Sequence, residues 1–388
     1  MSDTPYPEAR AVTRGPRHHF FGYYDKCPWD ATGRYLLALE TSFIHRPPEP
    51  EDTATIGLVD LRDGDRFRPI AETRAWNWQM GTMLHWLPQA PDRLILYNDR
   101  VDGRFVGIIR DVFSGETRTL PRPVYAITRD GRWAVSLNFA RVHQCRPGYG
   151  YAGVRDPWEE DPHPAEDGIY LMDLQTGANH RLFSLAQVVE GWHRPDMDGV
   201  KHWFNHLQFN PAGSRFIFLH RWYRRDRPGW FTQFFTAARD GSEIYCLNDD
   251  DMTSHFDWRD NEHILAWART HGVGDRYFLF TDRTAERQVV GEGVLTTDGH
   301  CSYSPDGRWI LTDTYPDKER MRTLLLYRPA DGKRVDIGRF FAPRELDGEI
   351  RCDLHPRWSR DGRQICFDSV HEGERQMYVV DVSHIVAG

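Results

Sequence analysis

Residues 298–309 read DGHCSYSPDGRW, and a second stretch, residues 353–364, reads DLHPRWSRDGRQ. Each contains a short strand pattern, a turn with Asp-Gly at its centre, and the start of an aromatic or aliphatic strand. Weaker copies of this pattern have their turns at residues 30–33, 90–92, 129–131, 211–213 and 259–261. Seven β-rich units of about 45 to 55 residues are typical of a propeller. The sequence therefore predicts an all-β fold, a seven-bladed β-propeller.

The two ends of the chain are predicted to meet in one blade. The first unit begins near Tyr24, and the last runs out after a strand at residues 377–382. A complete last blade needs an outer strand, and residues 9–13 are its simplest source. Such pairing closes the ring and removes an open sheet edge. Because repeat folds of this size close one core, we expect a single domain over residues 1–388.

Composition restricts the partners. The net charge is -8, and no block of Lys and Arg interleaved with aromatic residues is present, which argues against nucleic acid. No apolar run approaches the length of about 18 residues that a membrane helix needs, and no signal-peptide pattern opens the chain. The 6 cysteines show no paired spacing. We expect a reduced, cytoplasmic protein without a membrane partner; nothing in the sequence specifies an oligomeric state.

Histidines recur at one position of the repeat. Aligning the copies on their turns places an imidazole four residues before the position of Ser304 in five units, at His85, His206, His255, His300 and His355. The inner strand of a blade starts at one face of the disc and ends at its first hairpin, so these residues are expected near the starting face. The loops of that face are long, at residues 139–167, 189–204, 221–230, 315–322 and 340–349. Long insertions on one face of a repeat array usually mark the binding face.

Strand alternation adds polar partners to the imidazoles. Residues two apart share a face, so Asp353 accompanies His355, Asp298 accompanies His300, and Gln208 accompanies His206. Imidazoles with one or two carboxylates suit Mn, Fe, Zn or Ni better than Ca or Mg. The pattern predicts a metal or catalytic cluster. The alternative is that each histidine is a hydrogen-bonded structural residue, copied when the repeats arose.

Four stretches resemble the oligogalacturonate lyases. They are residues 206–220 (HLQFNPAGSRFIFLH), 252–258 (MTSHFDW), 299–313 (GHCSYSPDGRWILTD) and 353–382, which together cover blades four to seven, about half the chain. Members of that family are cytoplasmic seven-bladed propellers that cleave short uronate oligosaccharides by manganese-assisted β-elimination. The resemblance implies that His255 is the general base and that His300 and His355 are metal ligands, with Mn²⁺ as the expected cofactor.

The sequence also departs from the family pattern. Where the family has a Gln and two His in its last blade, this chain has Arg351, Asp353 and His355. Asp353 and His206 are further candidates for metal ligands, whereas Arg351 would be a poor ligand. The run at residues 18–26 (HHFFGYYDK) has no counterpart in those lyases. We therefore expect a substrate other than oligogalacturonate, still within the uronate class.

The remaining candidate residues have polar side chains on or near the inner strands. We assign His85, Gln208 and Arg351 to substrate binding. Arg221 follows blade four and is either a carboxylate clamp or a solvated charge; we place it in the catalytic set. Tyr24, Tyr315 or water protonates the leaving oxygen.

The resulting hypothesis is a metal-dependent lyase that acts on uronate-containing oligosaccharides. Removing a proton α to a carboxylate builds negative charge that a bound divalent cation stabilises, and a neutral imidazole is a suitable base. Two alternatives stay open. One is a propeller glycoside hydrolase that acts on a uronate-linked sugar, and the other is a non-catalytic propeller that binds glycan or peptide.

Overall fold

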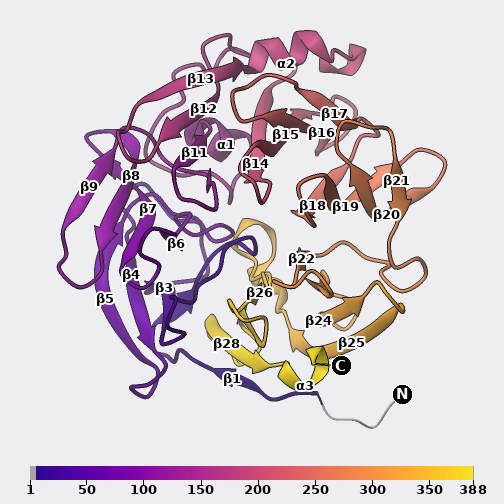
Figure 1. Cartoon of the computed structure of the whole chain (residues 1–388). Helices are drawn as coiled ribbons and strands as arrows, with labels where there is room; N and C mark the ends of the chain where they lie inside the picture. The colour runs from indigo at the N-terminus through magenta and orange to yellow at the C-terminus, as the bar shows by residue number, and fades with distance from the viewer. Residues whose placement is uncertain (1–5, 388) are drawn as a thin grey trace.

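A computed structural model describes residues 6–387, so the ends of the predicted range, residues 1–5 and residue 388, lie outside the description. Within the described residues, 28 strands form seven antiparallel sheets of four strands each. The sheets stand around a central axis, and the first strand of each blade is the innermost (Figure 1). The chain is a seven-bladed β-propeller, as the repeat predicted.

The first four blades run as follows. Blade one contains β2 (His18–Phe20), β3 (Tyr35–Thr41), β4 (Ala54–Asp60) and β5 (Arg66–Thr73). Blade two contains β6 (His85–Trp86), β7 (Leu94–Val101), β8 (Arg104–Asp111) and β9 (Thr117–Leu120). Blade three contains β10 (Ala126–Ile127), β11 (Trp133–Ser136), β12 (Gly168–Asp173) and β13 (Asn179–Ser184). Blade four contains β14 (His202–Phe209), β15 (Arg215–Tyr223), β16 (Trp230–Ala238) and β17 (Tyr245–Asn248).

The last three blades complete the ring. Blade five contains β18 (Thr253–Trp258), β19 (His263–Thr270), β20 (Gly274–Thr281) and β21 (Arg287–Val289). Blade six contains β22 (Ser302–Tyr303), β23 (Ile310–Asp313), β24 (Met321–Arg328) and β25 (Lys333–Phe341). Blade seven contains β26 (Arg357–Trp358), β27 (Gln364–Ser369), β28 (Gln376–Asp381) and, as its outer strand, β1 (Ala9–Ala11) from the other end of the chain.

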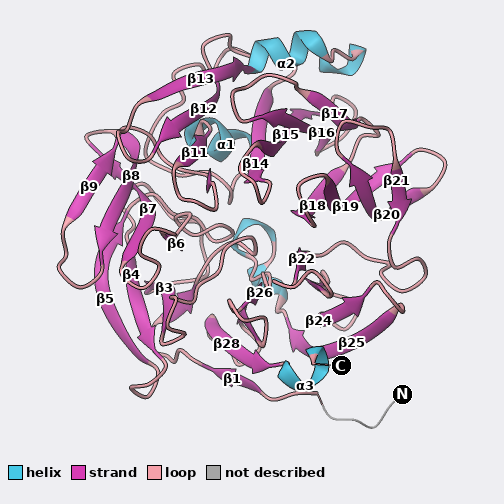
Figure 2. Cartoon of the chain, viewed as in Figure 1, coloured by secondary structure: helices cyan, strands magenta, loops and turns pink. Residues whose placement is uncertain are grey.

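Helices are few (Figure 2). They are α1 (Phe139–Cys145), α2 (Leu185–Gly191), α3 (Ser383–Val386) and the 3-10 turns Pro195–Met197, Arg344–Leu346 and Gly348–Ile350. Among the described residues, no helix has the length and apolar character needed to cross a membrane. The second strand of each blade is covered on both faces by its neighbours, and Leu36, Leu37, Ala38 and Leu39 of β3 are all fully buried.

The recurring turn follows from its side chains. The residue that opens the hairpin accepts a hydrogen bond from the backbone N–H five residues later, as at Ser304 (from Trp309, 3.0 Å) and Ser359 (from Gln364, 2.9 Å). Asp30, Thr128 and Asn210 do the same. Gly307 has a φ of +72°, in the left-handed region that favours glycine. The Asp-Gly pattern is therefore the chemistry of the inner hairpin.

The N-terminal strand completes blade seven. β1 pairs antiparallel with β28, Ala9 opposite Val380 and Ala11 opposite Tyr378. Beyond the strand, the Val12 N–H donates to the Met377 carbonyl (2.9 Å), and the Thr13 hydroxyl accepts from the Met377 N–H (2.9 Å). The edge of β28 is thus covered by the other end of the chain.

Blade one differs from the sequence prediction. Its inner strand is β2, which ends before the expected start near Tyr24, because residues 21–28 leave the blade and run into the centre of the ring (Figure 1). There Arg357 of blade seven donates to the carbonyls of Gly22 and Tyr23, and Trp86 of blade two donates to the Pro28 carbonyl (2.8 Å). We call residues 21–28 the central segment.

Candidate functional site

Four of the five predicted histidines share one register. In blade six, the inner hairpin opens with a hydrogen bond from the Ser304 N–H to the Trp309 carbonyl (2.8 Å), and each of the other blades has an equivalent bond. This bond marks the same position of the repeat in every blade. Counting back four residues from its equivalents gives His206, His255, His300 and His355 in blades four to seven. These blades are consecutive, so the four imidazoles come from neighbouring inner strands.

His85 does not share that register, and the sequence prediction is wrong there. In blade two the equivalent bond joins the Leu87 N–H to the Leu94 carbonyl (2.8 Å), so this hairpin is two residues longer than that of Ser304. The position four residues before Leu87 belongs to Met83. His85 therefore lies nearer the hairpin than the other four.

Backbone geometry at this register is unusual. His206 and His355 have φ values of +49° and +40°, and Met83, their equivalent in blade two, has +53°. L-residues rarely adopt this region. The pairing of β14 with β15 shifts between Asn205 and Gln208, where His206 lies. The inner strand is thus interrupted where it presents its imidazole, a type of backbone strain that tends to gather at functional sites.

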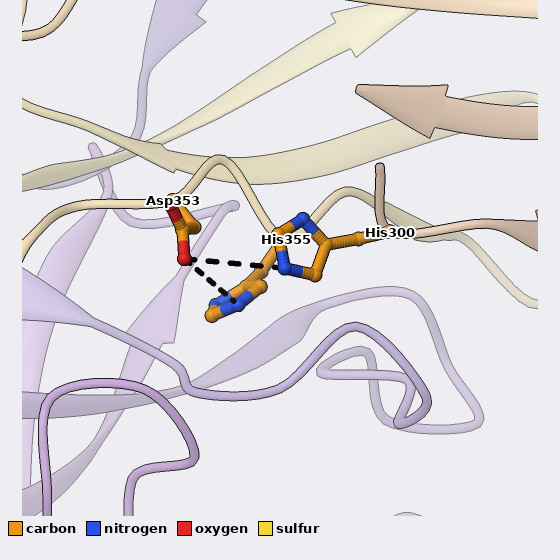
Figure 3. A group of neighbouring side chains, drawn as sticks. All are labelled: His300, Asp353 and His355. Atoms are coloured by element: carbon orange, nitrogen blue, oxygen red, sulfur yellow. Dashed lines mark ion pairs between the residues drawn. The ribbon is translucent and has the colours of Figure 1, made fainter. Parts of the chain in front are cut away.

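His300, Asp353 and His355 form one buried group (Figure 3). One ligand atom from each lies within 4.8 Å of the others. The Asp353 carboxylate Oδ2 is 3.9 Å from the Nε2 atoms of both His300 and His355. Neither Nε2 atom has a hydrogen-bond partner among the described residues. Two imidazole nitrogens without hydrogen-bond partners among these residues thus converge on one carboxylate.

His300 is held by a partner on the next strand. Its Nδ1 lies 2.8 Å from Oδ1 of Asp313, which also accepts the His300 backbone N–H at 2.7 Å. Burial alone raises the pKa of Asp313, but interaction with His300 outweighs this and lowers it. A carboxylate on one ring nitrogen orients the other nitrogen outward, as in many metal-binding histidines. Asp298 was expected beside His300, but its carboxylate bonds to His255.

Asp353 carries two guanidinium partners. Arg351 Nε donates to its Oδ2 at 2.7 Å, and Arg322 Nη2 lies 2.7 Å from its Oδ1. Burial acts to raise the pKa of Asp353, yet Arg351, Arg322 and the nearby imidazoles hold it well below its ordinary value. The carboxylate is therefore ionised. Arg351 is fixed further by the Tyr149 hydroxyl, 2.7 Å from its Nη2.

His255 lies against the group without belonging to it. Its ring centroid is 4.1 Å from that of His300. Nδ1 contacts Asp298 Oδ1 at 3.0 Å and Ser254 Oγ at 3.1 Å, and Nε2 makes no hydrogen bond to another described residue. Burial, followed by the neighbouring His300, lowers the pKa of His255. The ring is a neutral imidazole with an oriented, unused Nε2.

His206 has partners on both nitrogens and is not part of the three-residue group. The Tyr125 hydroxyl is 2.9 Å from Nδ1, and the Tyr23 hydroxyl is 3.4 Å from Nε2. The Tyr23 ring stacks on the imidazole, with centroids 5.2 Å apart. Burial, then Arg221, lowers the pKa of His206 well below its ordinary value.

Two further candidates, Tyr24 and Arg221, are buried. The Tyr24 hydroxyl donates to the Phe256 carbonyl (2.9 Å) and accepts from the Phe256 N–H (3.0 Å). Arg221 lies within β15, not in the predicted loop, and has no carboxylate partner among the described residues; its Nε donates to Thr232 Oγ1 at 3.2 Å. Burial, then repulsion from Arg146, lowers the Arg221 pKa to about 10.

His85 and Gln208 lie elsewhere. Both line a cavity of about 330 Å³ among the inner hairpins, with Pro211 and Arg129 in the same wall. None of His300, Asp353 and His355 lines this cavity. The structure therefore brings Arg351 to the three-residue group and separates the other two residues that were assigned to substrate binding.

Sequence reasoning missed two residues around the group: Asp313 holds His300, and Arg322 contacts Asp353. Tyr315, a predicted candidate for the proton donor, has its ring 6.0 Å from that of His300. A signal for Asp313 was present. The β22–β23 hairpin pairs Ser302 with Leu311, and extending that register by two residues puts Asp313 opposite His300.

Comparison with known proteins identifies the fold. No protein-family model matches the sequence, and no curated protein matches it either. Among solved structures, the oligogalacturonate lyase from Vibrio parahaemolyticus superimposes with a TM-score of 0.69 at 15% identity, covering 98% of this chain and 95% of the lyase. An oligogalacturonate lyase in complex with manganese gives 0.68 at 16% identity with the same coverage.

A third structure, the β-propeller domain of the Trilobed protease from Pyrococcus furiosus, gives a TM-score of 0.54 at 10% identity and covers 90% of this chain and 92% of that one. At these identities the likeness establishes the fold. The chain has the seven-bladed propeller fold of oligogalacturonate lyase over nearly its whole length.

Proposed function

We propose that this protein is a metal-dependent lyase that cleaves uronate-containing oligosaccharides by β-elimination. The observation that carries the proposal is the buried group of His300, Asp353 and His355, with an unused Nε2 on each imidazole. The fold shared with a lyase that was solved in complex with manganese supports the same chemistry.

The three residues fit a divalent transition metal. Two imidazole nitrogens and one ionised carboxylate are a donor set suited to Mn²⁺ and its neighbours, whereas Ca²⁺ and Mg²⁺ prefer oxygen ligands. Burial of the His300 and His355 Nε2 atoms without a hydrogen-bond partner among the described residues costs free energy of folding. His300, Asp353 and His355 would hold the ion. Arg351 and Arg322 share Asp353, so part of its charge is already compensated.

A bound cation would draw charge from the substrate carboxylate and so make the adjacent C5 proton easier to remove. His255 is the proposed base, because its Nδ1 is held by Asp298 and its Nε2 is unused. Nε2 takes the C5 proton, the C–H electrons form the C4–C5 double bond, and the C4–O bond breaks. The proposed base, His255, thus lies next to His300, Asp353 and His355 and is not one of the proposed metal ligands.

The leaving oxygen needs a proton, and Tyr315 is the better donor of the two tyrosines. The Tyr24 hydroxyl is occupied by the backbone of Phe256. The Tyr315 hydroxyl makes no hydrogen bond to another described residue, and its ring lies 6.3 Å from that of His255. Arg221, a buried guanidinium without a carboxylate partner among the described residues, is the proposed contact for a substrate carboxylate.

Metal content and product chemistry test the proposal together. The purified protein is analysed for metals and assayed against a panel of uronate oligosaccharides for an unsaturated product that absorbs in the ultraviolet. We expect a bound divalent metal, an absorbing product, and reversible inactivation by a chelator. Products that lack the double bond would replace the lyase with a hydrolase, and activity that survives complete metal removal would reject the metal mechanism.

A further inference from the structure

A cavity system lies on the hairpin side of the central segment. One cavity of about 750 Å³ is lined by residues of the inner hairpins such as Pro211, Asn261 and Pro305, and by Tyr24 of the central segment. It shares much of its wall with the cavity of about 330 Å³ that His85 borders. The shared residues are Asp25, Lys26, Cys27, Arg129, Pro211, Asp257, Trp258 and Arg360. We call the two together the hairpin cavity.

The hairpin cavity is separate from the metal group. None of His300, Asp353 and His355 lines it. Tyr24 borders both regions, since it lines the cavity while its ring lies 5.4 Å from that of His300. The proposed elimination chemistry uses no residue of this cavity.

Unpartnered polar atoms line its inner wall. His85 is 6% exposed; its Nδ1 bonds to the Met83 carbonyl (2.8 Å), and its Nε2 has no partner among the described residues. Burial, then Lys26, lowers the His85 pKa to about 3, so the ring is neutral. Gln208 Oε1 and Ser302 Oγ are likewise without partners. A neutral imidazole, an amide oxygen and a hydroxyl are suitable partners for sugar hydroxyls.

Two exposed arginines provide positive charge. Arg129 and Arg360 have no carboxylate within ion-pair distance among the described residues, whereas Lys26 pairs with Asp25 (2.9 Å) and Arg259 pairs with Asp260 (3.0 Å). Arg360 Nε donates to the Trp29 carbonyl (2.9 Å), which leaves its charge without a counter-ion. In a chain of net charge -8, two guanidiniums on one cavity that lack a carboxylate partner among the described residues favour a carboxylate or phosphate ligand.

Among the described residues, Asp257 is the one carboxylate of the cavity wall that has no ion-pair partner, so its charge would oppose a bound anion. It accepts hydrogen bonds from Gln208 Nε2 (2.9 Å) and the Tyr303 N–H (2.8 Å). Burial raises its pKa to about 6, so its charge is mostly present at pH 7 and is lost only as the pH falls below about 6. Trp86, Trp258 and Tyr303 add aromatic surface to the wall.

We propose that the hairpin cavity binds a hydroxylated anion of monosaccharide size, a sugar acid or a sugar phosphate. Its larger part, at about 750 Å³, lies in the range of about 300–1,000 Å³ usual for small-molecule sites. Arg129 and Arg360 take the charged group, and His85, Gln208 and Ser302 take hydroxyls. This site is independent of the proposed lyase activity and does not need the metal.

Calorimetric titration of the full-length protein tests the site. The probes are D-glucuronate, D-glucose 6-phosphate, neutral D-glucose and inorganic phosphate. We expect one or both charged sugars to bind, and glucose and phosphate to bind at least about tenfold more weakly. Arg129→Gln and Arg360→Gln should each weaken the charged sugar about tenfold. Arg104→Gln replaces another exposed arginine, on β8, that lines neither cavity; it is the matched control and should bind like wild type.

The same titration in a His300→Ala background separates this site from the metal group. Binding that persists there and remains sensitive to Arg360→Gln supports the hairpin cavity, whatever becomes of the lyase activity. The proposal fails if neither charged sugar binds, if both arginine variants bind as tightly as wild type, or if binding disappears with His300.

Discussion

At the scale of single residues, the proposed site separates a base from its metal ligands. His300 and His355 present unused Nε2 atoms to a shared carboxylate, while His255 stands beside them, held by Asp298. A ligand supports both metal binding and chemistry, whereas a base contributes only in the transition state. The two roles therefore predict different variant phenotypes.

Replacing the base should slow turnover strongly and leave the metal bound. His255→Ala is expected to lower kcat by about 10²–10⁴-fold, the usual contribution of general base catalysis, with metal content near that of wild type. His300→Ala and His355→Ala should lose both metal and activity. Elemental analysis beside a rate assay measures this. Full activity of His255→Ala would show that another group takes the proton.

The two tyrosines should respond differently to loss of the hydroxyl. Tyr315→Phe is expected to lower kcat with little change in KM or stability, because that hydroxyl has no partner among the described residues. Tyr24→Phe removes the partner of the Phe256 N–H and carbonyl and should cost about 1–3 kcal/mol of unfolding free energy. Denaturant unfolding and steady-state kinetics on both variants measure the contrast; a kcat loss confined to Tyr24→Phe would reverse the assignment.

Sequence could predict the histidines of the proposed metal site because spacing from a turn fixes strand register. The same arithmetic failed at His85, where the hairpin is two residues longer and has no Asp-Gly turn. Counting along the hairpin register could also have predicted Asp313 as the partner of His300. It could not reach Arg322, which meets Asp353 only because blades six and seven pack side by side.

At the scale of elements, the inner hairpins were predictable and the central segment was not. A turn that is built from its own side chains leaves a local pattern, as at Ser304 and Gly307. The central segment is fixed instead by distant residues, among them Arg357, Phe256 and Trp86. No local pattern records those contacts, and the inner strand of blade one was therefore placed too late in the sequence.

The outer strand of blade seven offers a test at this scale. Deleting residues 1–13 removes β1 and exposes the edge of β28, with the Met377 N–H and carbonyl left without their partners. We expect a lower thermal unfolding temperature and self-association through the open edge. Calorimetry and light scattering on the truncated and full-length proteins measure both. An unchanged Tm would show that β1 contributes little to closing the ring.

At the scale of the whole molecule, stability should depend on pH through a buried carboxyl outside the site. Asp167 precedes β12 and accepts hydrogen bonds from the Gly168 N–H (2.8 Å) and Asn138 Nδ2 (3.1 Å). Burial raises its pKa to about 6, above the ordinary value of 3.8. Below pH 4 the group is protonated in both folded and unfolded chains and contributes no pH dependence.

Between about pH 4 and pH 6 the unfolded chain releases this proton while the folded protein keeps it, so the free energy of unfolding falls as pH rises. The loss is complete above pH 6 and amounts to about 3 kcal/mol for a shift of about two pKa units. Asp167→Asn removes the titration, because an amide does not ionise. Its oxygen can still accept the hydrogen bond from the Gly168 N–H. The stability of the variant relative to wild type should therefore rise from pH 4 to pH 7, as denaturant unfolding at each pH would measure. A difference that stays constant over that range would show that Asp167 is ionised in the folded protein at about the same pH as in the unfolded chain.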